Sequence, residues 1–121
     1  NGSLYIHSSR GYTRSGEIKP ELAAPGVGIS AVAKNGSLTS VTGTSAAAAL
    51  TAGAAALLVD WRLEGNPRHL MTSSELKNFL IRGAGRSRDL TYPNRSWGYG
   101  TLDVYGVFES LLEPKTGCHI L

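Results

Sequence analysis

The residue with the clearest chemical potential in this sequence is Ser45, which follows a Thr-Gly-Thr triplet and precedes a run of small and apolar residues over positions 46–59. The run predicts a helix over residues 45–61, with Ser45 at or just before its N-terminus. The first backbone N–H groups of a helix have no partner inside the helix, and this end carries a partial positive charge. Both features stabilise an oxyanion beside a serine, so the position suits a nucleophile. A serine that only caps the helix has the same local sequence, and both interpretations stay open at this point.

The predicted helix is apolar on all sides instead of carrying a single apolar stripe. A helix of this kind is buried in a protein core or spans a membrane. A membrane span needs about 20 consecutive apolar residues, whereas this run is shorter, contains Thr51 and Gly53 and ends at Asp60. We therefore expect a buried central helix and no membrane span. Gly53 costs about 1 kcal/mol relative to alanine inside a helix, which predicts that a neighbour packs closely against it.

Short β-favouring segments precede the serine. Residues 4–7 (LYIH) predict a first strand, and residues 27–32 predict a second. Residues 34–37 (KNGS) predict a hairpin turn, because Asn-Gly tolerates positive φ. Residues 38–41 then return towards the serine, so a hairpin is expected to deliver Ser45.

A second helix is expected after the loop at residues 64–67. Thr72 and Glu75 form a T-x-x-E capping box, which marks a helix start. The helix that follows stops at Gly83. Three residues form its apolar face: Leu76, Phe79 and Leu80.

A third amphipathic helix follows the turn-rich residues 84–100. We expect it to be opened by Thr101 and Asp103 and closed before Pro114. Its apolar face consists of Val104, Val107, Phe108 and Leu111. The sequence thus predicts one domain over residues 1–113 and a tail over residues 114–121.

The composition is that of a globular protein, with 41% apolar and 17% charged residues among 121 and no linker that divides the chain. The net charge of +3 is modest, and the arginines form no dense run. We therefore expect a solvated basic face and no nucleic-acid partner. Cys118 is the one cysteine, which excludes an internal disulfide and a cysteine-based metal site. No motif for a cofactor or a metal is present.

Gly43-Thr44-Ser45, followed by an alanine-rich helix with Gly53 eight residues on, resembles the serine motif of the subtilisin-like serine peptidases, the subtilases. Stretches on both sides resemble the same family in the same order. Upstream they read SRG at 9–11 and IKPELAAPGV at 18–27, and downstream WGYGTLDV at 97–104. Within the family, GYTRSGEIKPELAAPGV and LTYPNRSWGYGTLDVYGVF are similar to the clostridial Csp-type germination proteases. The resemblance covers most of the chain.

The resemblance implies an α/β fold, the C-terminal portion of a subtilisin-like three-layer fold, with a few strands, a buried central helix and two further amphipathic helices. It implies that Ser45 is the nucleophile of a Ser-His-Asp triad, that its N–H is an oxyanion donor with Thr44 in support, and that the substrate is a protein or peptide. In subtilisin the triad residues follow the chain order Asp, His, Ser. His and Asp are therefore expected upstream, in the remainder of the peptidase domain.

None of the histidines present, His7, His69 and His119, stands in an H-G-T-H motif, and no aspartate stands in a D-[ST]-G motif. Asp60, Asp89 and Asp103 are expected to be helix caps or surface charges. Residues 1–121 should therefore have little turnover by themselves.

The sequence departs from the family pattern at three positions. Ala49 replaces a common proline, Leu50 replaces a common histidine, and Glu21 replaces the usual aspartate. Proline in a first helical turn is compatible with a helix but not required, and Glu21 keeps the charge. Ala47 also rules out the G-x-S-x-G elbow of α/β hydrolases.

Two further functions remain open. Some proteins of the Csp group have degenerate triads, so a pseudoprotease that keeps Ser45 and acts as a binding or signalling module is the alternative to an endopeptidase. A standalone structural domain is a third. The resemblance also implies a secreted or extracytoplasmic bacterial location, with association with spores as a further expectation.

Overall fold

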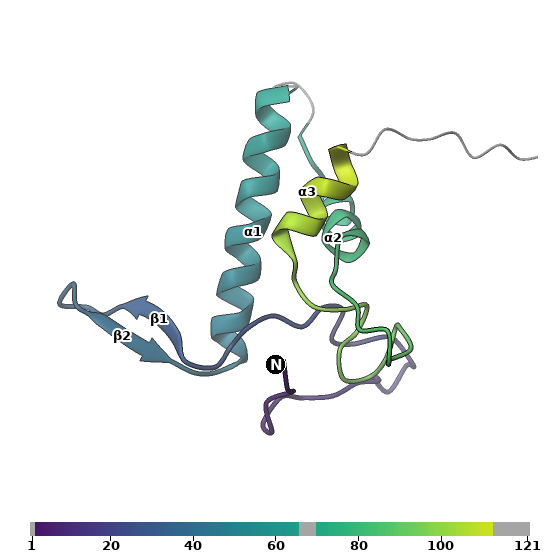
Figure 1. The fold of residues 1–121 in the computed structure, drawn as a ribbon, viewed down its shortest axis with the longest axis horizontal. Helices are drawn as coiled ribbons and strands as arrows, with labels where there is room; N and C mark the ends of the chain where they lie inside the picture. The colour runs from purple at the N-terminus through teal and green to yellow at the C-terminus, as the bar shows by residue number, and fades with distance from the viewer. Residues whose placement is uncertain (1, 66–69, 113–121) are drawn as a thin grey trace, which may run out of the picture.

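The computed structural model describes residues 2–65 and 70–112. Along the chain it contains β1 (Ile29–Val32), β2 (Leu38–Val41), α1 (Thr44–Gly65), α2 (Ser73–Arg82) and α3 (Val104–Leu112). Figure 1 shows α1 as a long helix with α2 and α3 beside it, while the hairpin of β1 and β2 projects away from its N-terminal end. The mixed α/β content and the three helices agree with the prediction.

The predicted hairpin is confirmed. β1 and β2 pair antiparallel, with Ile29 opposite Val41 and Val32 opposite Leu38. The turn is closed because the Ala33 N–H donates to the Ser37 carbonyl at 2.8 Å. Gly36 has φ of 80°, a value that a residue with a side chain rarely adopts. The chain therefore turns at the Asn-Gly pair, as the sequence indicates.

The predicted strand at residues 4–7 is wrong. The Ser8 N–H donates to the Tyr5 carbonyl at 2.9 Å, which closes a turn over Ile6 and His7. In the described part of the chain no strand pairs with this segment. β-favouring residues form a strand only where a partner supplies hydrogen bonds, so composition alone was insufficient at this segment.

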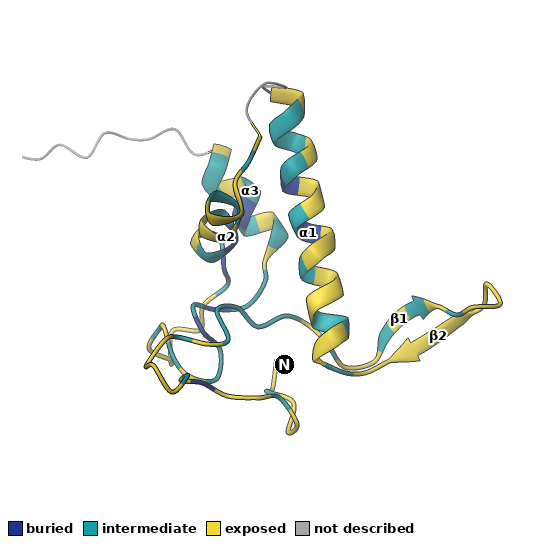
Figure 2. Cartoon of the chain, turned by 180° about the vertical axis from the view of Figure 1, so that it is seen from behind, coloured by how far each residue is buried: buried dark blue, intermediate teal, exposed yellow. Residues whose placement is uncertain are grey.

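Helix α1 has 22 residues, starting one residue before and ending four residues after the predicted range. Among the described residues of α1 only Ala54 and Leu58 are buried, so these residues alone do not supply the predicted burial. Figure 2 shows the rest of α1 as exposed or partly exposed. One side of the helix packs on α2 and α3, and the described residues leave most of its other faces uncovered. No heavy atom outside the helix lies within 4 Å of a side-chain position on Gly53, so these residues do not supply the predicted close packing.

The length of α1 also overturns the argument that the run is too short for a membrane. By length and composition, α1 is the one helix in the described ranges that could cross a bilayer. Core helices of soluble proteins satisfy the same criterion, so this observation by itself is weak support for a span.

The core lies where the three helices meet. Leu58 of α1 and Val107 of α3 are 1% and 0% exposed, and Leu80 of α2 and Ala54 of α1 complete the buried cluster. Gly83, just after α2, has no room for a side chain, because a Cβ there would lie 2.3 Å from the Val107 Cα. The lack of a side chain at Gly83 thus lets α2 and α3 pack closely.

Both predicted helix starts after α1 are found, with one correction. The Glu75 N–H donates to the Thr72 hydroxyl at 3.2 Å and the Thr72 N–H donates to the Glu75 carboxylate at 2.9 Å, which confirms the capping box of α2. The Gly106 N–H donates to the Asp103 carboxylate at 2.9 Å, so Asp103 caps α3. Thr101 does not, because its hydroxyl donates to the Gly85 carbonyl at 3.2 Å. Pro114 and the predicted tail lie outside the described residues.

Candidate functional site

The candidate site is the serine turn, which we define as residues 42–45. α1 begins at Thr44, so Thr44 and Ser45 are its first two residues, and both are exposed. The Gly43 carbonyl accepts the N–H groups of Ala46 at 3.1 Å and Ala47 at 3.4 Å, which makes Gly43 the cap residue. The interpretation of Ser45 as a plain N-cap is therefore wrong.

Gly43 leaves helix N–H groups free, because it has no side chain to accept them. The side chain before it, Thr42, accepts from the Gly28 N–H at 2.9 Å and is thus occupied elsewhere. Across residues 2–65 and 70–112, the backbone N–H groups of Thr44 and Ser45 donate to no acceptor. Two unpaired donors at the positive end of a 22-residue helix can stabilise a negatively charged oxygen beside Ser45.

The serine turn is held by the segment that precedes the hairpin. The Gly43 N–H donates to the Gly26 carbonyl at 2.7 Å, and Gly28 binds Thr42 as described. The two ends of the hairpin are thereby closed against each other immediately before α1. The position of Ser45 depends on this junction of residues 26–28 with residues 42–43.

Residues 20–23 are in turn fixed by the turn at residues 97–101. The Tyr99 N–H donates to the Glu21 carbonyl at 2.8 Å, and the Leu102 N–H donates to the Ala23 carbonyl at 2.7 Å. The Arg86 guanidinium donates to the carbonyls of Tyr99 and Ile81, each at 2.7 Å, and so ties this turn to the end of α2. Sequence reasoning missed Arg86, because its partners are main-chain atoms that leave no residue pattern.

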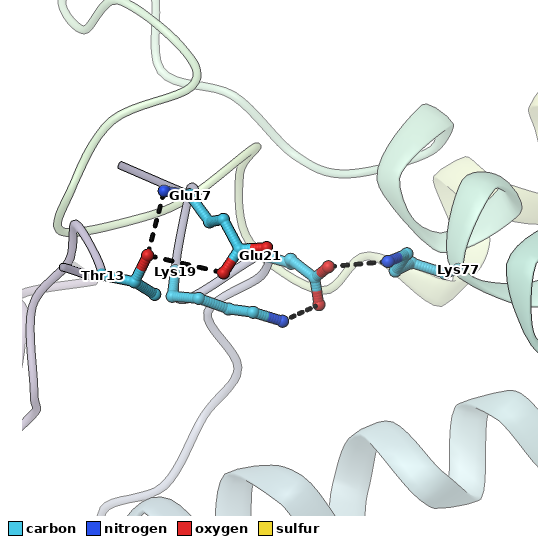
Figure 3. Close-up of polar contacts among 5 residues, drawn as sticks. All are labelled: Thr13, Glu17, Lys19, Glu21 and Lys77. Carbon is cyan, nitrogen blue, oxygen red and sulfur yellow. Dashed lines mark hydrogen bonds and ion pairs between the residues drawn. The ribbon is translucent and has the colours of Figure 1, made fainter. Parts of the chain in front are cut away.

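Glu21 forms an ion-pair bridge between two lysines (Figure 3). Its carboxylate lies 2.8 Å from the Lys77 ammonium of α2 and 3.0 Å from the Lys19 ammonium. Hydrogen bonds from Lys77 and then Lys19 lower the pKa of Glu21, and the hydrogen bond with Glu21 raises the pKa of Lys77. The glutamate that replaces the family's usual aspartate thus links residues 19–21 to α2.

A cavity of about 1370 Å³ opens between the N-terminal segment, residues 20–27, α1 and α2. It extends to the serine turn at Gly43 and Thr44. The part of α1 that lines it consists of small residues at helical spacing: Ala47, Ala48, Thr51, Ala52 and Ala55. Small side chains over two turns of helix allow another backbone to approach closely.

Within residues 2–65 and 70–112, no hydrogen bond joins an acidic or basic side chain to Ser45. His7 lies in the turn near the N-terminus and Asp103 caps α3. Among the residues that the structure describes, no imidazole or carboxylate bonds the Ser45 hydroxyl, and no group of three or more His, Cys, Asp or Glu residues could hold a metal. His69 and His119 lie outside the described residues. The described residues thus combine an exposed serine in the first turn of a helix with backbone N–H groups that have no acceptor among them.

Comparisons with known proteins show which family this chain resembles. The sequence pattern of the family described as Peptidase_S8, Subtilase family, matches residues 1–100. A solved structure, titled the structure of the Clostridium perfringens CspB protease, is 33% identical with a TM-score of 0.84. The match covers 96% of this chain and 25% of that chain, so the chain spans a quarter of the length of this relative. No match was found among curated proteins.

Proposed function

The chain belongs to the subtilase family, and we propose that it is the C-terminal, serine-bearing part of a subtilisin-like endopeptidase domain with Ser45 as the nucleophile. The similarity to a Csp-type protease agrees with the narrower resemblance in the sequence. The observation that carries the proposal is the position of Ser45 in the first turn of α1, beside N–H groups that have no acceptor in the described chain.

In the proposed reaction, the Ser45 hydroxyl oxygen bonds to the carbonyl carbon of a peptide and its proton passes to a histidine base. The resulting oxyanion accepts hydrogen bonds from the Ser45 N–H, with Thr44 in support. The histidine then protonates the leaving amine as the C–N bond breaks, and water hydrolyses the acyl-enzyme. Loss of one oxyanion donor lowers kcat by about 10²–10³ in serine peptidases, so the free N–H groups contribute substantially, although less than the hydroxyl.

The histidine and its orienting aspartate come from sequence upstream of residue 1. Two observations support this part of the proposal. The chain spans a quarter of the length of the CspB protease, and the serine stands last in the triad order of subtilisin. Residues 1–121 alone are then expected to have little or no turnover.

The remainder of the peptidase domain is the proposed partner of α1. Leu50 and Leu57 are 39% and 55% exposed in this structure, and the cavity beside α1 is lined by small residues. An apolar surface of this kind is covered in a stable protein. We therefore propose that α1 is a core helix and not a membrane span. We also propose that no nucleic acid is bound. A secreted or extracytoplasmic location in a spore-forming bacterium is proposed on the same family resemblance.

The alternative is a pseudoprotease that binds or signals. The observation that favours it is that the described residues hold Ser45 without any base. The upstream sequence discriminates between the two: intact D-[ST]-G and H-G-T-H motifs support the peptidase, and loss of either supports the binding module.

Hydrolysis of a peptide library by the protein that carries residues 1–121 together with its upstream sequence tests the proposal. We expect turnover, and we expect Ser45→Ala to reduce it by about 10⁴-fold or more. Ser40→Ala is the matched control, because Ser40 is an exposed serine on β2 whose loss leaves the serine turn intact. Equal activity of Ser45→Ala and Ser40→Ala would rule out the proposed nucleophile.

A further inference from the structure

Gly26 is the residue at which the segment before the hairpin touches the serine turn. Its carbonyl accepts the Gly43 N–H at 2.7 Å, which is short for an N–H···O bond. Gly43 is also the cap of α1, because its own carbonyl accepts the N–H groups of Ala46 and Ala47. Gly26 is therefore hydrogen-bonded directly to the cap residue of the helix turn that carries Ser45.

No side chain fits at Gly26. A Cβ there would lie 2.7 Å from the Gly43 carbonyl oxygen and 3.2 Å from the Ala47 Cβ, whereas ordinary contacts begin near 3.4 Å. Gly26 is absent from the glycines with positive φ, so its backbone conformation is open to any residue. Close approach to Gly43, and not an unusual backbone angle, is what requires glycine at this position.

The segment that carries Gly26 cannot easily withdraw from the serine turn. Three residues earlier, the Ala23 N–H donates to the Gly100 carbonyl at 3.0 Å and the Ala23 carbonyl accepts the Leu102 N–H at 2.7 Å. Two residues later, Gly28 is bound to Thr42. A side chain at Gly26 would therefore displace the Gly43 carbonyl, and with it the first turn of α1.

We propose that Gly26 is a positioning residue for the nucleophile: by lacking a side chain and accepting the Gly43 N–H, it sets where the Ser45 hydroxyl and N–H stand relative to a bound substrate. This inference rests on the proposed function of Ser45. It assigns a role in the reaction to a residue that acts on Ser45 through Gly43.

The test uses the protein with its upstream sequence and a fluorophosphonate that modifies the active serine, with the limiting rate kinact and the affinity KI measured separately. Gly26→Ala is expected to lower kinact by about 100-fold, since a displacement near 1 Å can cost that factor, and to leave KI within about twofold. Val27→Ala is the matched control, because it changes the next side chain, which is 57% exposed, without placing an atom against Gly43. An unchanged kinact in Gly26→Ala overturns the inference.

A double variant separates the two contacts of the added side chain. Gly26→Ala combined with Ala47→Gly removes the neighbour at 3.2 Å but keeps the carbonyl at 2.7 Å. We expect kinact to stay low. Recovery of kinact would show that the obstacle is the helix side chain, which contradicts positioning through Gly43.

Hydrogen exchange tests the inference independently of fluorophosphonate labelling. Peptides that cover residues 42–47 should exchange faster in Gly26→Ala than in Val27→Ala, and equal exchange overturns the inference. A wild-type protein that is never labelled contradicts the proposed function, and the exchange result still decides on Gly26. If Gly26→Ala does not fold, Thr42→Val takes its place, because it removes the acceptor of the Gly28 N–H. We expect Thr42→Val to lower kinact and leave KI unchanged. An unchanged kinact in this variant counts against the inference.

Discussion

Gly43 caps α1 without a side chain. This lowers the stability of the helix but leaves its first N–H groups free for chemistry. Asn, Asp and Ser at a cap position accept an N–H group of the first turn and stabilise a helix by a few tenths of a kcal/mol relative to Gly. The same hydrogen bond would occupy a donor that an oxyanion needs. At the residue scale, the serine turn therefore keeps donors free at a small cost in helix stability.

Replacement of Gly43 by Asp tests whether the free N–H groups are needed for reaction at Ser45. A Cβ at Gly43 would lie 3.3 Å from the Ser45 hydroxyl oxygen, and Gly43 has φ of 158°, a value that residues with side chains rarely adopt, so a side chain there strains the backbone. We expect Gly43→Asp to lower the free energy of unfolding, because backbone strain of about 1–3 kcal/mol exceeds the few tenths of a kcal/mol that a capping side chain adds, while fluorophosphonate labelling slows by about 100-fold. Thermal unfolding and labelling rates measured on the same preparation check both. A variant that labels at the wild-type rate contradicts the role of the free N–H groups.

The ion pairs of Glu21 make a prediction about pH. The lysines lower the pKa of Glu21 from its ordinary value of 4.5 in the folded protein. A lowered pKa means that the stabilisation is present above about pH 4.5 and is lost as the pH falls through the folded-state pKa. Glu21→Gln should therefore reduce the free energy of unfolding by less than about 1 kcal/mol at pH 7, and the difference from wild type should vanish in acid.

Denaturant titrations at pH 7 and below pH 4 measure this difference. Glu109→Gln serves as the control, since Glu109 is an exposed carboxylate on α3 that forms no ion pair within the described ranges. The effect of Glu21→Gln should also shrink in high salt, which screens exposed charges. A deficit that persists unchanged in acid would show that Glu21 acts through packing and not through its charge.

The elements that the sequence predicts best are those with local signals. The hairpin follows from Asn-Gly, α2 from the Thr72 and Glu75 capping box, and the start of α3 from Asp103. Residues 4–7 have the composition of a strand but no partner, so the prediction failed where long-range pairing decides. The role of Thr101 was missed for the same reason, since its partner Gly85 is sixteen residues away.

The capping box offers a test at the scale of one element. Thr72→Ala removes the acceptor of the Glu75 N–H, and we expect the free energy of unfolding to fall by about 1 kcal/mol. Ser74→Ala is the control, because Ser74 is exposed inside α2 and alanine there favours the helix. A smaller loss for Thr72→Ala than for Ser74→Ala would contradict the capping role.

At the scale of the whole molecule, the site could be predicted only in part. The sequence indicates Ser45 and Thr44 and the helix they begin, because motif and helix are contiguous. Gly26 and Arg86 act through main-chain contacts across the fold, and no residue spacing in the sequence predicts such contacts. The burial of α1 depends on what lies against it, and the described residues cover only one side.

The exposure of α1 yields a prediction about the longer protein. Leu57 is 55% exposed in this structure, so Leu57→Asn should change the stability of residues 1–121 very little. In the protein with its upstream sequence, the same change should reduce the free energy of unfolding by about 2 kcal/mol or more, because an amide is then buried without a partner. Denaturation of both lengths, with and without the substitution, makes the comparison. An equally small effect in both would mean that the remainder of the domain does not cover α1.

The central claim is that Ser45 is the nucleophile of a subtilase active site, and the most direct measurement is the position of a covalent adduct. The protein with its upstream sequence is treated with a fluorophosphonate, digested and mapped by mass spectrometry. We expect one adduct, on the peptide that contains Ser45, which is lost in Ser45→Ala and retained in Ser40→Ala. An adduct that survives in Ser45→Ala, or a protein with an intact Asp and His that takes up no label, would contradict the claim.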